Sequence, residues 1–147
     1  MGIDTFDFTP DPISLLESNR NLGYSIEEAI SDLIDNSITA RAKNIWFIHK
    51  WDAEKSFISI YDDGNGMDEV ELFKAMKLGS SSPLIERDSK DLGRFGLGLK
   101  VASWSLCRIL TVATKKKKGD LNIRKWDLDY VSEKNRWLLK RETDQSS

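Results

Sequence analysis

The segment from residue 26 to 40 combines a helical apolar stripe with two paired polar side chains. Its apolar residues recur with the period of one helix face, at Ile26, Ala29, Ile30, Leu33 and Ile34. Ser25 and Glu28 at its start have the spacing of a capping box. Asp32 and Asn36 are four residues apart, so they stack one turn above each other. The sequence therefore predicts a helix that presents an acid and an amide together beside the core.

The other elements place helices early and strands late. We expect further helices over 12–17, 68–78 and 97–106, and strands over 44–50, 57–61, 108–114 and 121–131, with a last strand starting near 137. The 68–78 helix is expected to bury Leu72, Phe73 and Met76. Antiparallel connections in this order favour an α+β domain, with helices on one face of a mixed, mainly antiparallel sheet.

Length and composition are those of one globular domain. The 147 residues suit a single unit over 1–147, with a loose arm over 1–10 and a polar tail over 142–147. A net charge of −2 gives no electrostatic case for direct DNA binding, and the run from Lys115 to Lys118 is interpreted as a solvated loop between strands. No apolar run approaches the ~20 residues that span a bilayer. Without an export signal, and with Cys107 as the single cysteine and an expected core thiol, the cytosol is the expected location.

A glycine-rich segment follows the second predicted strand, with the sequence Asp62-Asp-Gly64-Asn-Gly66-Met67. Alternate residues of a strand share a face, so Asp62 should follow Ile58 and Ile60 to the edge of the core as a partly buried carboxylate. Such a group needs a hydrogen-bond donor. A plain turn is the alternative interpretation, because Asn-Gly is a strong turn signal.

A second glycine segment, Gly93-Arg94-Phe95-Gly96-Leu97-Gly98-Leu99-Lys100, precedes the predicted helix over 97–106. Glycines at a helix start let backbone N–H groups approach phosphate oxygens. The polar segment before it, over 80–91, has no clear periodicity and the length of a lid or binding loop. A flexible hinge is the alternative interpretation of these glycines.

Together the three segments have the chemistry of a nucleotide site. Asp62 could accept a hydrogen bond from an adenine amino group, and Gly64 and Gly66 leave room for a flat base. The amide oxygen of Asn36 suits Mg²⁺, which prefers oxygen ligands. Asp32 could orient or deprotonate an attacking water. The sequence contains neither a P-loop nor a dinucleotide-binding glycine fingerprint.

In these three segments the chain resembles the GHKL ATPases, which include gyrase, the 90-kDa heat-shock chaperones, histidine kinases and MutL. The residues that flank the segments are most similar to those of the MORC-like and MutL-like branch. The resemblance implies a two-layer Bergerat-type sandwich, ATP and Mg²⁺ as ligands, and an ATP lid over 79–95. It assigns Mg²⁺ to Asn36 and the nucleotide contacts to Asn36, Asp62, Gly64, Gly66, Met67, Gly93, Arg94, Phe95, Gly96, Leu97, Gly98 and Lys100. For Lys100, a solvated side chain is the alternative.

Two departures from the family pattern bear on turnover. Asp32 stands at the position of the general base, where the family usually has glutamate, and it is one methylene shorter. Glu28, one further turn back, could compensate, although its capping role explains its presence better. No late threonine segment is recognisable, and family members often take a lysine or arginine from a following domain. We therefore expect the N-terminal part of a longer protein, whose downstream domain is a partner.

The resemblance implies Mg-dependent ATP binding with slow hydrolysis that acts as a conformational switch, and a possible ATP-dependent homodimer. The alternative is a nucleotide-sensing interaction module without turnover. A phosphotransfer kinase would need a phosphoacceptor histidine, and the single histidine, His49, lies in a strand-like run.

Overall fold

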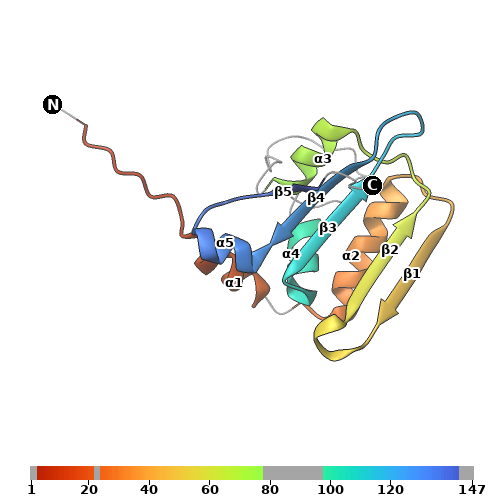
Figure 1. The fold of residues 1–147 in the computed structure, drawn as a ribbon, viewed down its shortest axis with the longest axis horizontal. Helices are drawn as coiled ribbons and strands as arrows, with labels where there is room; N and C mark the ends of the chain where they lie inside the picture. The colour runs from red at the N-terminus through yellow and green to blue at the C-terminus, as the bar shows by residue number, and fades with distance from the viewer. Residues whose placement is uncertain (1–2, 22–23, 78–97, 143–147) are drawn as a thin grey trace.

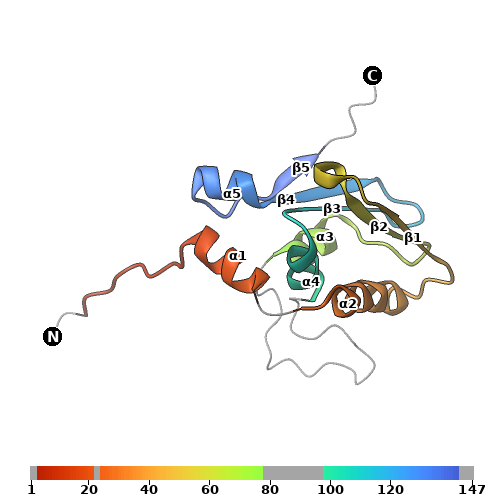
Figure 2. The same cartoon turned by 90° about the horizontal axis from the view of Figure 1, so that it is seen from below.

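The computed structural model describes residues 3–21, 24–77 and 98–142 of the chain. In it the strands form one layer and most of the helices a second (Figures 1 and 2). The helices are α1 (Pro12–Arg20), α2 (Ile26–Thr39), α3 (Glu69–Met76), α4 (Gly98–Leu106) and α5 (Leu128–Lys134), with a short 3₁₀ turn, η1, at Ala53–Lys55. The strands are β1 (Ile45–Lys50), β2 (Phe57–Asp62), β3 (Ile109–Thr114), β4 (Asn122–Asp127) and β5 (Lys140–Glu142). The predicted α+β class is confirmed.

The capping box at the start of α2 forms as the sequence predicts. The Glu28 amide donates to Ser25 Oγ at 3.1 Å, and the Ser25 amide donates to Glu28 Oε2 at 2.9 Å. Ala29 is fully buried, but Ile26 is 52% exposed, so its assignment to the core-facing stripe is wrong. The buried contacts of α2 begin one turn later, at Ala29.

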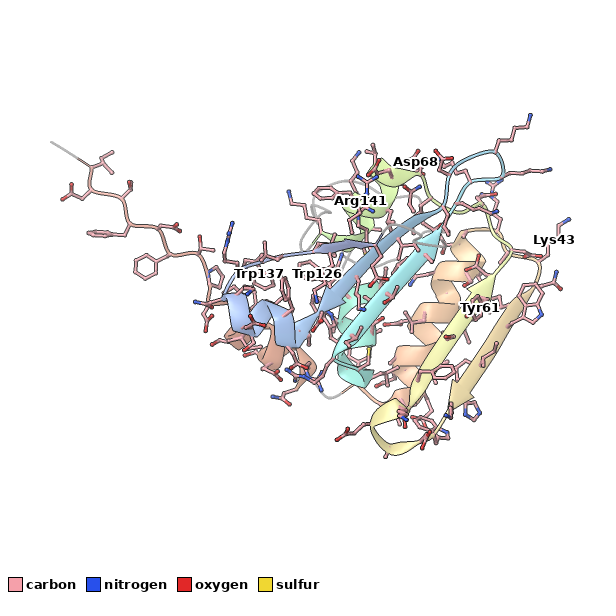
Figure 3. The ribbon with its side chains drawn as sticks, in the orientation of Figure 1. Lys43, Tyr61, Asp68, Trp126, Trp137 and Arg141 are labelled. Carbon is pink, nitrogen blue, oxygen red and sulfur yellow. The ribbon has the colours of Figure 1, made fainter. Side chains whose placement is uncertain are left out.

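The strands pair in two groups. β1 and β2 form an antiparallel hairpin in which Trp46 lies opposite Tyr61, and the outer face of that hairpin carries the exposed Tyr61 ring (Figure 3). β3, β4 and β5 form a second sheet in that order. Every strand pair within the described residues is antiparallel, so the parallel component of the expected mixed sheet is not seen there.

The core is formed by side chains of α1, α3, α4, β4 and α5. Its fully or almost fully buried side chains are Leu16, Leu72, Met76, Trp104, Trp126, Leu128 and Val131. Three indole rings meet edge-to-face, with centroids 6.0 Å apart for Trp104 and Trp126 and 6.4 Å apart for Trp126 and Trp137 (Figure 3). Residues Lys100 to Trp104 are all buried, so α4 is the central helix of its layer.

One predicted element boundary and one predicted burial are wrong. The predicted strand over 121–131 ends at Asp127, whose side chain accepts a hydrogen bond from the Tyr130 amide at 3.1 Å and starts α5. Leu128 and Val131, three residues apart, then face the core. In α3, Leu72 and Met76 are buried as predicted, whereas Phe73 is 55% exposed.

The lysine run does connect two strands, β3 and β4, but it is not simply solvated. The Lys116 ammonium lies 3.2 Å from Asp68 Oδ2 and 2.8 Å from Glu71 Oε2, at the start of α3. These ion pairs tether the loop to α3. Residues 3–10 run as an extended, exposed segment (Figure 1). None of the described helices combines the length and apolar character needed to cross a membrane.

Candidate functional site

Asp32 and Asn36 lie on consecutive turns of α2, as predicted. The Asp32 carboxylate is half-buried, and its Oδ2 atom accepts a hydrogen bond from the Tyr24 hydroxyl at 3.0 Å. This bond to a carboxylate raises the pKa of the Tyr24 phenol above its ordinary value. Asn36 is exposed, and among the described residues no hydrogen bond engages its side-chain amide. Its oxygen is therefore available to a ligand.

Asp62 lies at the end of β2 and is tied directly to α2. Its Oδ2 atom accepts a hydrogen bond from Ser37 Oγ at 2.9 Å, and its Oδ1 atom accepts one from the Gly64 amide at 2.9 Å. Ser37 is buried, but Asp62 is exposed rather than partly buried, although Ile58 and Ile60 before it are half-buried. The carboxylate is thus fixed in orientation and open to solvent.

Gly64 lets the end of α2 approach the backbone closely, and Gly66 does the same for the β3–β4 loop. A Cβ on Gly64 would lie 2.8 Å from the Cβ and the carbonyl oxygen of Ala40, at the end of α2. The amide of Asn65 donates to that same carbonyl at 2.8 Å. A Cβ on Gly66 would lie 2.0 Å from the carbonyl oxygen of Lys115, and φ is +65° there. Both glycines therefore have a packing role besides any contact with a base.

The residues that flank these glycines are also anchored. Asp63 Oδ1 accepts hydrogen bonds from the amides of Lys43 and Asn44 at 2.7 and 2.8 Å. These bonds, led by that from the Asn44 amide, hold the pKa of the Asp63 carboxyl below its ordinary value. The Met67 amide donates to Thr114 Oγ1 at 2.9 Å, and its side chain packs against the core. The segment 62–67 therefore bridges α2, β1 and β3.

The turn predicted to bind phosphate lies almost entirely outside the described residues. Gly93, Arg94, Phe95, Gly96 and Leu97 lie outside the described residues, as do the expected lid over 79–95 and most of the tail. Gly98 is the first residue of α4. Helices α2 and α4 lie side by side (Figures 1 and 2). The start of α4 therefore belongs to the same layer of helices as Asp32 and Asn36.

The Lys100 side chain contacts the end of α3, which was not expected from either interpretation of the sequence, a phosphate contact or a solvated side chain. It is fully buried, so the solvated alternative is wrong. Its ammonium donates to the carbonyl oxygens of Ala75 and Lys77, each at 2.7 Å. Burial lowers the pKa of the Lys100 ammonium to about 8, and because the two carbonyl acceptors favour the charged form, the group is protonated at neutral pH. Its predicted contact with a phosphate stays a prediction.

The donor set suits a magnesium ion held mainly by phosphates and water. Within the described ranges no three His, Cys, Asp or Glu side chains gather as a metal cluster. Mg²⁺ commonly keeps several waters and takes only one or two protein oxygens when substrate phosphates are present. The amide oxygen of Asn36, which no described residue engages, fits that requirement. A surface hollow of about 310 Å³ lies elsewhere and contains no candidate residue; it is lined by Asp68, Lys116, Lys118, Gly119, Asp120 and Asn122.

Comparison with known proteins identifies the family. Residues 24–147 match the family described as "Histidine kinase-, DNA gyrase B-, and HSP90-like ATPase". The chain belongs to this ATPase family. Membership of this family implies ATP binding, and the predicted resemblance to the GHKL ATPases is confirmed.

Two much longer relatives place the chain near the MORC ATPases. It is 32% identical over 104 residues to "ATPase morc-1" of Caenorhabditis elegans, covering 71% of this chain and 12% of that protein. It is also 32% identical over 123 residues to the "Structural maintenance of chromosomes flexible hinge domain-containing protein GMI1" of Arabidopsis thaliana, covering 70% of this chain and 7% of that protein. The chain thus spans only a small part of the length of these relatives.

Two side chains of the site were not predicted. Ser37 orients Asp62, and Tyr24 engages Asp32. Ser37 directly follows Asn36, so the need of Asp62 for a donor could have pointed to it. Tyr24 precedes α2 and reaches its partner over eight positions, a spacing that no helical rule highlights.

Proposed function

We propose that this domain binds ATP together with Mg²⁺, hydrolyses it slowly and uses the cycle as a conformational switch. The observation that carries the proposal is the hydrogen bond from Ser37 to Asp62. It joins the helix that holds the acid–amide pair to the strand end that holds the second carboxylate. Residues about 25 positions apart in the chain therefore converge on one place, as a shared nucleotide site requires.

In this site Asp62 binds the adenine. An ionised carboxylate offers about four lone-pair positions, and Ser37 and Gly64 occupy one on each oxygen. The exposed remainder can accept the adenine amino group. Because both oxygens are already held, the carboxylate needs little reordering when the base arrives.

Asn36 holds the magnesium ion beside the phosphates. It directly precedes Ser37, the residue of α2 that donates to Asp62. Mg²⁺ supplies charge neutralisation for the phosphate oxygens when bound. The backbone amides of the glycine turn over 93–98 are proposed to hold those oxygens.

Asp32 acts as the base for an attacking water. Its carboxylate lies one turn from Asn36 on α2. The Tyr24 hydroxyl holds one of its oxygens and leaves the other to accept a proton. An aspartate reaches less far than a glutamate, which favours slow turnover.

Binding is tested by thermal unfolding and calorimetry with ATP and a non-hydrolysable analogue, with and without Mg²⁺. A ligand at a hundred times its Kd should add about 2.7 kcal/mol of stability. Asp62→Asn should weaken the binding of every adenine nucleotide, and Asn36→Ala should remove the dependence of ATP binding on magnesium. Asp35→Asn, on the same helix, is the matched control and should leave both unchanged. Absence of any shift with adenine nucleotides contradicts the proposal.

A nucleotide-sensing module without turnover is the second candidate. The observation in its favour is that the base position carries the shorter Asp32, already engaged by Tyr24. Phosphate release by a longer form of the protein separates the two. Release that disappears in Asp32→Asn supports the ATPase, whereas binding without release in both wild type and Asp32→Glu supports the sensing module.

The remaining parts of the proposal concern partners. The two relatives are far longer than this chain, and we propose that a downstream domain completes the switch. We also propose that ATP promotes a homodimer. Light scattering after size exclusion, with ATP analogue and without nucleotide, tests it; a monomer under both conditions rejects the dimer.

A further inference from the structure

Lys100 and Trp126 together complete the C-terminal end of α3. The Lys100 ammonium donates to the carbonyl oxygens of Ala75 and Lys77, and the Trp126 indole N–H donates at 3.0 Å to that of Met76 between them. The last carbonyls of a helix have no partner within the helix. Three successive carbonyl groups thus receive donors from α4 and β4, far away in the sequence.

The charge of Lys100 is balanced by peptide groups. Among the described residues, none of the ion pairs includes Lys100. Its ammonium instead lies at the negative end of the α3 dipole, where a cation is favoured. Moving it away would take a charged donor from two carbonyl groups, which is costly where water cannot replace it. Lys100 is therefore held firmly against α3.

Lys100 also lies in the first turn of α4, two residues after Gly98. The first amide groups of a helix are free to bind an anion, and they can do so only if the helix end is fixed in place. We propose that Lys100 is a positioning residue for the ATP triphosphate: it ties the first turn of α4 to the end of α3 and so fixes the amides that receive the phosphates. This inference rests on the proposed ATP site.

The test compares Lys100→Met with the matched control Lys74→Met, which removes an exposed lysine from α3. Calorimetry measures the Kd of Mg-ATP and of adenosine, and hydrogen exchange in nucleotide-free protein measures protection of the last turn of α3. We expect Lys100→Met to weaken the binding of ATP by about tenfold or more, which is equivalent to about 1.4 kcal/mol of binding free energy. Adenosine binding through Asp62 should stay within error, and protection at the end of α3 should fall. Lys74→Met should change none of these.

Three results overturn the positioning role. The first is an unchanged affinity for ATP, and the second is an equal loss of affinity for ATP and adenosine. The third is a loss of affinity for ATP with unchanged protection of α3, which would indicate that Lys100 acts only by direct contact with a phosphate. If Lys100→Met does not fold, Lys100→Gln, which keeps a donor and removes the charge, undergoes the same measurements. A wild-type chain that binds no adenine nucleotide overturns the proposed function and this role together. Normal wild-type binding with an unaffected variant overturns this role alone.

Discussion

Replacing Gly66 with alanine tests whether the glycine is required by the fold before any nucleotide is bound. Its φ of +65° lies in the left-handed region, where an L residue costs about 1–2 kcal/mol. The new Cβ would also lie 2.0 Å from the Lys115 carbonyl oxygen and 2.7 Å from its carbon. These are backbone atoms, and the Lys116 ion pairs with Asp68 and Glu71 hold their loop against α3. The loop cannot retreat without disturbing those contacts.

The expected destabilisation follows from these two effects. Overpacking a close contact typically adds about 1–3 kcal/mol to the left-handed cost, giving about 2–5 kcal/mol in total. For a chain of this size, one kcal/mol lowers the Tm by roughly 2–4 °C, so Gly66→Ala should lower it by about 4–20 °C. Thermal unfolding followed by circular dichroism, without nucleotide, measures the shift.

Gly119→Ala is the matched control within the same β3–β4 loop. A Cβ there would meet Lys116 atoms at 3.6 Å or more, which is ordinary contact, and φ is not in the left-handed region. That variant should be neutral or stabilised by up to about 1 kcal/mol, through a less flexible unfolded chain. Equal melting temperatures for the two variants would show that Gly66 is not required by packing and serves only ligand access.

Three further predictions follow from the described contacts. Asp32→Asn should let the pKa of the Tyr24 phenol fall toward its ordinary value, as measured by tyrosinate absorbance against pH; an unchanged titration would show that the hydrogen bond does not form in solution. The hydrogen bond from Lys140 holds the pKa of the Asp127 carboxyl below its ordinary value, so the stability it contributes is present above the unfolded pKa of about 3.9 and is lost as the pH falls through the folded value. Asp127→Asn, which keeps the helix cap, should therefore flatten the loss of Tm at acid pH, and identical slopes would refute this. Burial raises the pKa of the Cys107 thiol, so alkylation of folded protein at neutral pH should be much slower than after unfolding; equal rates would show an accessible thiolate.

Local patterns in the sequence predicted the elements that depend on near neighbours. The capping box of α2 requires only Ser25 and Glu28, and both bonds form. The β1–β2 hairpin needs only two adjacent runs of alternating residues. The α5 helix was missed because its residues, including Tyr130 and Val131, are also good strand formers. The Asp127 cap and the burial of Leu128 decide in favour of the helix.

The candidate site was predictable in its residue types but not in its contacts. The sequence indicated that Asp62 needs a donor, and Ser37 provides it from another element. It could not show that Gly66 makes room for the Lys115 carbonyl, because that contact joins residues about 50 positions apart. Nor could it show that Lys100 reaches α3, since a lysine after a glycine turn gives no local signal of direction.

The way α3 ends has a consequence for the order in which the chain folds. An eight-residue helix is too short to persist by itself in water. Its last turn is completed by Lys100, 25 positions after Ala75, and by Trp126, 50 positions after Met76. Such distant partners come together only after large loops have closed, which slows folding. Helix α3 should therefore gain stable structure late, after α4 and β4 have docked, while α2, which is longer at 14 residues, can begin to form early.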